Sequence, residues 1–372
     1  MDSRIDRAAQ ARELVWLYAR RTALHLSWFI RLALALFLFV GALQVMKTGA
    51  ASLDILNNGG LLVRNAGSTF GLGWLGALLV LSGSPIAASA LTLVAGGSID
   101  VIQGFTMLTG SRLGAAFVVL LVGVIYALRG GRGQRKKPVA TAVLALCVTA
   151  LIYVPGAIIG FLLLQWEPFS GIQGAFPMHV VDMIDVIYAA PVAAVEGLPG
   201  PAVFFLGLLI LLASLKMIDS IVPEMSEEAI ERTWAGRLRR KWPMFGLGCL
   251  VALVTMSVSV ALTILVPLVA KNCVKRQDIL PYIMGANIAT LGDTLLAAYL
   301  LGSPDAVTIV LAGILGVTLV SLIVLTFFYE PVKGAIWSFQ NYLVGKRNRL
   351  AVFTAALFVV PLGIIGASWF AG

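Results

Sequence analysis

The sequence predicts an all-α polytopic membrane protein with two inverted-topology repeats, each with a re-entrant hairpin, and about seven full spans. Three observations lead to this fold class. Hydrophobic residues make up 59% of the 372 positions and charged residues only 12%, whereas soluble domains average about 25% charged residues. Apolar stretches of the roughly 20 residues that cross a bilayer as a helix recur along the whole length. A shift of 175 positions aligns the two hairpin regions without a gap.

Seven apolar segments are long enough to cross the membrane as single helices. We expect them at 24–46, 105–128, 139–164, 201–217, 279–300, 306–328 and 351–369. Two further apolar stretches, about 71–97 and 244–271, are interrupted in their middle by Ser82-Gly-Ser-Pro85 and by Ser257 with Ser259. Each half measures roughly 20 Å as a helix, which is less than the roughly 30 Å apolar core of a bilayer. These two stretches are therefore expected to be re-entrant hairpins.

The distribution of Lys and Arg predicts the orientation of the chain. Residues 129–137 form a strongly basic loop, residues 138–215 contain no Lys or Arg, and 216–241 and 333–349 are basic again. Cytoplasmic loops carry an excess of Lys and Arg. We therefore expect a multi-pass protein of the bacterial inner membrane with a cytoplasmic N-terminus. The first hairpin then enters from outside and the second from inside.

The same observations divide the chain into five parts. Residues 1–23 are expected to be a cytoplasmic amphipathic segment, 24–128 the first repeat, and 129–200 a basic loop, a linking helix and an external loop. Residues 201–328 form the second repeat, and 329–372 form a cytoplasmic loop and the C-terminal span.

The net charge of +9 does not indicate a nucleic-acid partner. Most of the cations lie in loops between apolar segments, as the positive-inside rule requires, so membrane lipids are the expected surroundings. The three cysteines, Cys147, Cys249 and Cys273, show no CxxC spacing. Neither a disulfide nor a metal site is expected from them.

Four serines mark the interruptions of the two hairpins: Ser82, Ser84, Ser257 and Ser259. A helix broken within the membrane leaves unpaired backbone groups, which are tolerated beside a polar cavity or a ligand. Ser84 followed by Pro85 predicts an N-cap and first turn, whose positive end favours an anion. Serine oxygens can also ligate a hard cation such as sodium. The alternative is that these serines satisfy neighbouring carbonyls or permit close helix packing.

Arg112 and Asp293 are charged residues within apolar spans. Such a charge costs roughly 2.5–3.5 kcal/mol on insertion scales and indicates a functional site. The fork of an arginine matches phosphate or carboxylate oxygens, so Arg112 is a candidate anion ligand. Asp293 is a candidate cation or proton site. The alternatives for Arg112 are extension to the membrane interface or pairing with Asp293.

Three polar residues on the span of Asp293 have helical spacing. Asn287, Thr290 and Thr294 lie at i, i+3 and i+7 and share a face, with Asp293 adjacent to it. This pattern favours a lined cavity, although hydrogen bonds between helices produce much the same pattern.

The motifs resemble those of the sodium–phosphate cotransporter type II family, over about 24–128 and 201–328. Each repeat of that family has a Gln-Ser-Ser-Ser hairpin and then a Gly-Ala-Asn-Ile-Gly-Thr-Thr stretch. Here the hairpins read Leu81-Ser-Gly-Ser84 and Met256-Ser-Val-Ser259, and the stretches read Gly110-Ser-Arg-Leu-Gly114 and Gly285-Ala-Asn-Ile-Ala-Thr290. Both glutamines are replaced, the middle serine of each triplet is missing, and Arg112 stands where the family has asparagine.

The resemblance implies a secondary transporter of phosphate or a related anion, coupled to sodium or protons. We expect a substrate site of Ser82, Ser84, Arg112, Ser257, Ser259 and Asn287, and ion coupling through Asp293, Thr290 and Thr294. Sodium is the candidate coupling ion, no other cofactor is expected, and a homodimer is a candidate assembly. A rival hypothesis is a flippase for a phosphate-bearing lipid, because Leu81 and Met256 make the site less polar. A membrane enzyme is disfavoured because the sequence has no HExxH or GxSxG motif.

Overall fold

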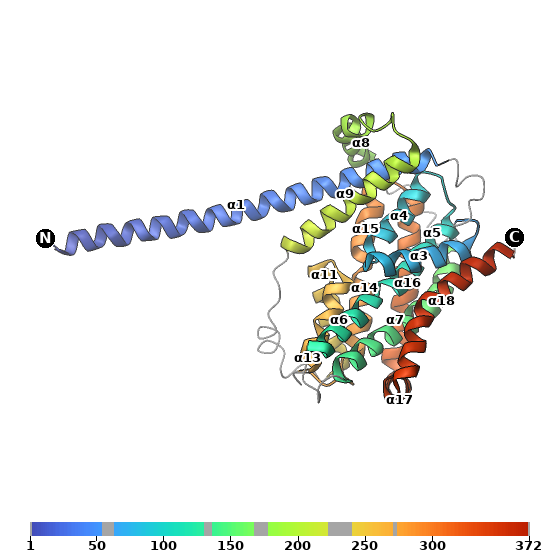
Figure 1. The fold of residues 1–372 in the computed structure, drawn as a ribbon. Coiled ribbons are helices and arrows are strands. Elements are labelled where there is room, and N and C mark those ends of the chain that lie inside the picture. Colours follow the sequence, from blue (N-terminus) through green and yellow to red (C-terminus); the bar gives the residue numbers. More distant parts are fainter. Residues whose placement is uncertain are drawn as a thin grey trace.

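The computed structural model describes residues 2–53, 63–129, 136–166, 178–221, 240–270 and 274–370, with the backbone alone at 2–26, 178–180 and 258–259. Within these ranges the regular structure is entirely helical (Figure 1). Seven helical segments are long and apolar enough to cross a membrane, so the multi-pass prediction is confirmed. They are Ser27–Ala51, Val101–Arg129, Lys136–Trp166, Gly200–Ile221, Leu280–Leu300, Pro304–Phe327 and Arg347–Phe370.

The helices that form these segments are labelled in Figure 1. They are α1 (Asp2–Ala51), α5 (Val101–Ala115) with α6 (Phe117–Arg129), α7 (Lys136–Trp166), α9 (Gly200–Ile221), α14 (Leu280–Ala289) with α15 (Leu291–Leu300), α16 (Pro304–Phe327) and α18 (Arg347–Phe370). α1 runs without a break from Asp2, so no change in the backbone marks the expected boundary between residues 23 and 24.

Both interrupted stretches break where the sequence predicts. The first forms α3 (Ala66–Val80) and α4 (Ser84–Ala95), and the second forms α11 (Lys241–Thr255), α12 (Val258–Thr263) and α13 (Leu265–Ala270). Leu81 and Met256 end the first helix of each stretch in the left-handed region, at φ 59° and 47°. This conformation costs an L-residue roughly 1–2 kcal/mol. Among the described residues, no other non-glycine residue has a positive φ, and these two are 175 positions apart.

The packing repeats with the same offset of 175. α3 packs against α5, and α11 packs against α14, each through glycines that let one backbone touch the other. A Cβ added at any of these glycines would come within 2.0–2.1 Å of a carbonyl oxygen on the neighbouring helix. The equivalent glycine–carbonyl pairs are Gly73–Met107 and Gly248–Tyr282, and Gly110–Phe70 and Gly285–Phe245.

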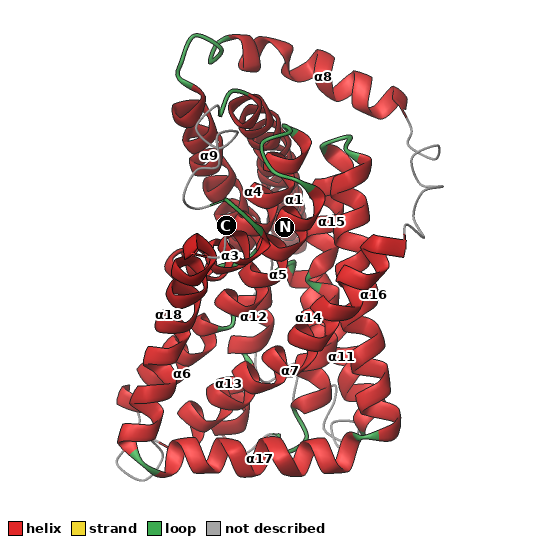
Figure 2. Cartoon of the chain, turned by 90° about the vertical axis from the view of Figure 1, so that its right-hand side faces the viewer, coloured by secondary structure: helices red, strands yellow, loops and turns green. Residues whose placement is uncertain are grey.

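Two further helices occupy segments that the sequence assigned to loops between spans. α8 (Met178–Ala193) lies in the expected external loop, and α17 (Tyr329–Gly345) lies in the expected cytoplasmic loop. Figure 2 shows α17 lying across one end of the bundle and α8 at the other end. α17 buries Ile336, Gln340 and Leu343, which share one face. With 17 residues of mixed polarity, α17 falls short of a span in both length and hydropathy, so these two criteria did not detect it.

Candidate functional site

Arg112 lies in the last turn of α5 and is 1% exposed. α4 packs against both α5 and α15, so the side chain is enclosed by helices from both halves of the sequence. This burial excludes extension of Arg112 to the membrane interface in this conformation. The charge must therefore be compensated inside the protein.

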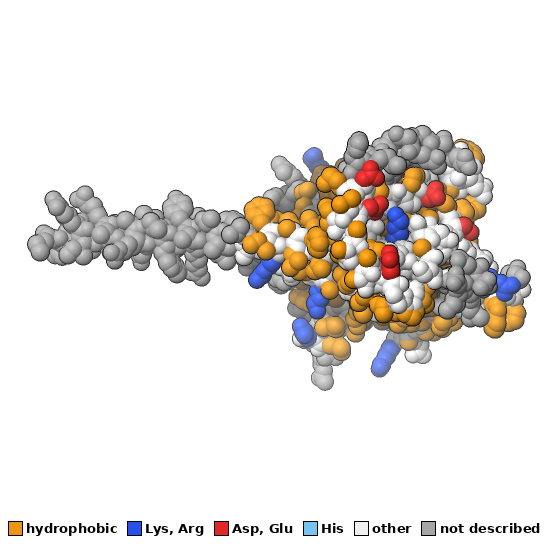
Figure 3. All heavy atoms as spheres, turned by 90° about the horizontal axis from the view of Figure 1, so that it is seen from above, with side chains coloured by type: hydrophobic (Ala, Val, Ile, Leu, Met, Phe, Trp, Pro, Cys, Tyr) orange, Lys and Arg blue, Asp and Glu red, His pale blue; other side chains and the backbone are white. Residues whose placement is uncertain are grey.

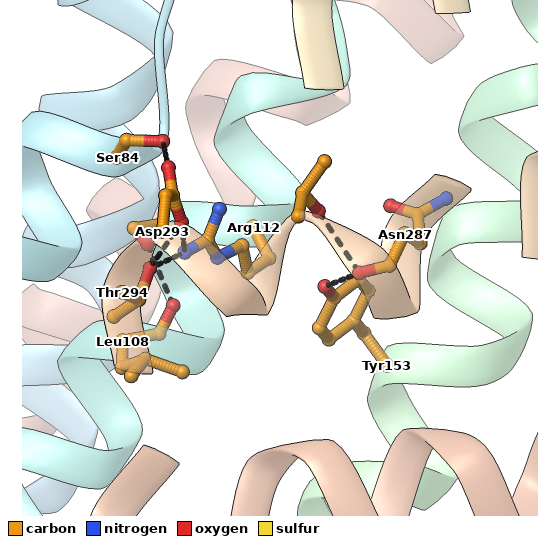
Figure 4. Close-up of polar contacts among 9 residues, drawn as sticks. Ser84, Leu108, Arg112, Tyr153, Asn287, Asp293 and Thr294 are labelled. Carbon is orange, nitrogen blue, oxygen red and sulfur yellow. Dashed lines mark hydrogen bonds and ion pairs between the residues drawn. The ribbon is translucent and has the colours of Figure 1, made fainter. Parts of the chain in front are cut away.

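Asp293 and Thr294, in the first turn of α15, face Arg112 (Figure 4). Arg112 Nη2 donates a hydrogen bond to Thr294 Oγ1, and it lies 3.6 Å from Asp293 Oδ1. Thr294 Oγ1 donates to Asp293 Oδ1 at 2.8 Å. Ser84, at the start of α4, donates to the other carboxylate oxygen of Asp293. Four of the predicted site residues therefore form one polar cluster, and the sequence alternative that pairs Arg112 with Asp293 is what the structure shows.

The hydrogen-bonding capacity of Arg112 is only partly used. Its Nε and Nη1 atoms are buried and have no hydrogen-bond partner among the described residues. Buried polar groups without partners are costly and usually indicate a function or a ligand. Since guanidinium N–H groups bind carboxylate and phosphate oxygens, Arg112 retains donors for a second anion beside Asp293.

The local sequence at the first break explains the position of Ser84. The prediction that Ser84 caps α4 was wrong by one residue, because Gly83 is the N-cap and Ser84 is the first helical residue, followed by Pro85. The Ser84 hydroxyl is therefore free to reach Asp293. A Cβ at Gly83 would lie 3.1 Å from the Ser111 carbonyl oxygen, so a glycine brings this turn close to α5. The positive end of α4 then lies beside the cluster.

Asn287 and Thr290 belong to a second, adjacent group. Asn287 Nδ2 donates to Ile283 O at 2.8 Å and to Thr149 Oγ1 at 3.1 Å. The backbone carbonyl oxygen of Asn287 accepts hydrogen bonds from Tyr153 Oη at 2.8 Å and from Thr290 Oγ1 at 3.0 Å. The face expected for Asn287, Thr290 and Thr294 is thus divided, because Thr290 lies at the junction of α14 and α15. Asn287 and Thr290 turn towards α7, whereas Thr294 turns towards Arg112.

Thr149 and Tyr153 of α7 were not among the site residues predicted from the sequence. Tyr153 is 1% exposed, interacts with Thr290, and lies within electrostatic range of both Arg112 and Asp293. Figure 4 shows Arg112 between the Asp293 cluster and the Tyr153–Asn287 pair. The signal for these residues was their i, i+4 spacing on an apolar span, but only the fold reveals that they face α14.

Among the described side chains of the four hairpin serines, only that of Ser84 is hydrogen-bonded within this cluster. Ser257 caps α12, since its Oγ accepts from the Val260 N–H at 3.3 Å. The Ser82 N–H donates to Ala77 O, and within the described residues its hydroxyl makes no hydrogen bond to Arg112 or Asp293. The side chain of Ser259 lies outside the described part of the structure. The convergence of all four serines therefore stays a prediction.

Comparison of the chain with models of known protein families, with curated proteins and with solved structures finds no match. Function is therefore argued from the chemistry of the site.

Proposed function

We propose that this protein is a secondary transporter of phosphate or a related anion, coupled to sodium or protons, working by alternating access around two hairpins. The observation that carries the proposal is Arg112, a fully buried cation whose Nε and Nη1 have no partner among the described residues. Arginine is suited to tetrahedral and carboxylate anions because its donors are fixed in one plane. A charge buried within a span is, by default, a candidate for the transport pathway.

The internal repetition of the chain supports the proposal. The left-handed breaks and the glycine–carbonyl contacts recur 175 positions apart, as expected for two repeats, each with its own hairpin. Transporters built from inverted repeats place substrate and coupling ion near the bilayer midplane, beside discontinuous helices. The Arg112 cluster lies beside one such break, and the resemblance to sodium–phosphate cotransporters of type II agrees with this placement.

The charges at the two ends of the molecule support a cytoplasmic position for α17. α17 and the residues that follow it carry Lys333, Lys346, Arg347 and Arg349, whereas α8 and the turn that follows it carry Asp182, Asp185 and Glu196. Figure 3, which views the molecule from the α8 end, shows acidic side chains spread over this face. By the positive-inside rule, the α17 end would face the cytoplasm of a bacterial inner membrane.

The geometry also supports a proposal for how anion and cation are coupled. In this conformation the Asp293 carboxylate, 3.6 Å from Arg112 Nη2, balances the charge of the guanidinium. An incoming anion bound by the unpartnered Nε and Nη1 would share the charge of Arg112 and leave the Asp293 carboxylate with less counter-charge. A buried carboxylate without a partner is unfavourable, so Asp293 would bind a proton or, with the Ser84 and Thr294 oxygens, a sodium ion. Anion and cation would thus enter the site together.

Transport by reconstituted protein tests the proposal. Proteoliposomes should accumulate labelled inorganic phosphate under an inward sodium or proton gradient, and Arg112→Gln should abolish uptake, because the guanidinium is the main anion ligand. Lys333→Gln is the matched control. It also removes a positive charge, but from α17, which lies across one end of the bundle (Figure 2). Folded wild-type protein that takes up no phosphate under either gradient would contradict the small-anion proposal.

One observation favours a second candidate, a flippase for a phosphate-bearing lipid. An apolar cavity of about 670 Å³ lies among α3, α7, α17 and α18, and Leu113, the neighbour of Arg112, lines it. Such a cavity could hold an acyl chain while Arg112 binds the phosphate. Arg112-dependent movement of a fluorescent phosphatidic acid between leaflets, without phosphate uptake, would identify this function.

A further inference from the structure

A basic cavity of about 380 Å³ lies at the α17 end of the molecule, apart from the Arg112 cluster. Lys137, Lys275, Arg276 and Gln277 line it together with Trp337 and two valines. The polar lining residues and Trp337 come from three places in the chain: the first turn of α7, the segment between α13 and α14, and α17. Their convergence is therefore a product of the fold and not of one basic stretch of sequence.

Arg276 is held in a fixed orientation within this cavity. Its guanidinium carbon lies 4.5 Å from the centre of the Trp337 ring, so the planar group stacks on an aromatic face. Its Nε is buried and has no hydrogen-bond partner among the described residues. Burial lowers the pKa of Arg276 below its ordinary value, which means that the surroundings do not fully compensate the charge. The group is thus positioned and short of an acceptor.

A neighbouring cavity provides an internal comparison. It measures about 400 Å³ and is lined by Lys241 and Lys333 together with Asp278 and Glu330, so that its positive and negative charges are matched. No acidic side chain is among the described residues that line the Arg276 cavity. The first turn of α7 adds the positive end of a helix of 31 residues. An anion is therefore favoured in the Arg276 cavity and not in the neighbouring, charge-matched cavity.

We propose that the cavity formed by Lys137, Lys275, Arg276 and Trp337 is a binding site for a phosphate group, separate from the transport site. Two sources can supply this chemistry: the headgroup of an anionic lipid, or a soluble phosphate. The position beside α17, which lies across the end of the bundle (Figure 2), suits a headgroup, because basic pockets on the cytoplasmic side of membrane proteins bind anionic lipids. The site would hold α7, α17 and the segment before α14 together.

Thermal unfolding of the purified full-length chain tests the site. Stability is measured in nanodiscs of phosphatidylcholine alone, in nanodiscs that also contain phosphatidylglycerol, and in phosphatidylcholine nanodiscs with inorganic phosphate. A ligand that binds only the folded state raises the midpoint by an amount that grows with the logarithm of its concentration relative to its Kd. Arg276→Gln should lower the affinity for the stabilising ligand about tenfold or more. Lys275→Gln, a second variant at an exposed position, should have the same effect. Lys333→Gln, which alters the neighbouring cavity, should leave the affinity unchanged.

The pattern of losses separates this site from the transport site. Phosphate stabilisation that survives Arg276→Gln and Lys275→Gln but disappears in Arg112→Gln would assign the effect to Arg112 and overturn the proposal. So would equal losses in Arg276→Gln and Lys333→Gln, because that result indicates general surface charge. Stabilisation by phosphatidylglycerol alone identifies a lipid site, and stabilisation by inorganic phosphate identifies a soluble ligand. Stabilisation of the wild type by neither probe also overturns the proposal.

Discussion

At the scale of single residues, the central feature is the buried Arg112 with the Asp293 carboxylate at 3.6 Å. The hydroxyls of Ser84 and Thr294 donate hydrogen bonds to that carboxylate. Breaking a buried ion pair by removing one partner is costly, by roughly 3–5 kcal/mol, because the other charge stays buried. Arg112 and Asp293 are therefore coupled in stability as well as in the proposed transport.

Asp293→Asn should lower the thermal stability of the protein, because Arg112 then lacks a counter-charge. Phosphate should restore more stability in this variant than in the wild type, since the anion no longer competes with the carboxylate. The measurement is the unfolding midpoint as a function of phosphate concentration, with Asp305→Asn, at an exposed position on α16, as the control. A phosphate effect in Asp293→Asn no larger than in the wild type would contradict the competition. Phosphate that binds at Arg276 shifts the midpoint of the wild type and of Asp293→Asn equally, so it does not affect the comparison.

The sequence predicted much of this cluster, but not how its members are grouped. Arg112, Asp293, Ser84 and Thr294 were identified because polar residues are conspicuous in apolar spans. Tyr153 was not identified, because its contact with Asn287 joins positions 134 apart, and pattern within one helix cannot indicate which helices meet. For the same reason the sequence left open whether Arg112 pairs with Asp293.

At the scale of helices, close backbone contacts at glycines define the two pairs α3–α5 and α11–α14. A helix surface with glycine allows the partner backbone to approach more closely than any side chain permits. The same contacts in both pairs make them equivalent structural units. The hairpin breaks lie directly after the first helix of each pair, at Leu81 and Met256.

Gly73→Ala and Gly248→Ala should both destabilise the protein, by about 1–3 kcal/mol each. The new methyl group would lie 2.1 Å and 2.0 Å from the carbonyl oxygens of Met107 and Tyr282, so the helices must separate. Gly246→Ala is the matched control on α11, because nothing lies within 4 Å of its added Cβ. Thermal unfolding in one detergent compares the three variants, and a loss in Gly246→Ala as large as in Gly248→Ala would refute the packing argument.

The breaks themselves were predictable, whereas their detailed capping was not. Serine, glycine and proline in the middle of an apolar stretch marked the first break. The left-handed turn at Leu81 moved the start of α4 by one residue relative to the predicted cap. Capping depends on backbone dihedral angles that leucine and methionine rarely adopt, so residue type gave no indication of them.

At the scale of the whole molecule, seven apolar helical segments confirm the expected multi-pass organisation. Hydropathy was sufficient for this because a bilayer requires long apolar helices. It was insufficient for α8 and α17, which lie at the two ends of the bundle and have mixed composition. The unequal charge of these two ends leads to an expected orientation.

Cysteine labelling tests this orientation. In a variant whose native cysteines are replaced by alanine, Glu196→Cys should react with a membrane-impermeant maleimide in intact spheroplasts, whereas Lys346→Cys should react only after permeabilisation. Both positions are exposed, and they lie next to α8 and α17, respectively. Retained phosphate uptake verifies that each variant is folded. The reverse labelling pattern would invert the proposed topology.

The ion pair of Arg112 and Asp293 has a consequence for the return half of the proposed transport cycle. A carrier that has released its cargo must reorient with an empty site, and an isolated arginine would meet a high dielectric barrier in that step. With Asp293 as its internal partner, the empty site is electrically neutral. The unloaded protein would therefore reset with little dependence on membrane voltage, so that the cycle can run repeatedly in one direction.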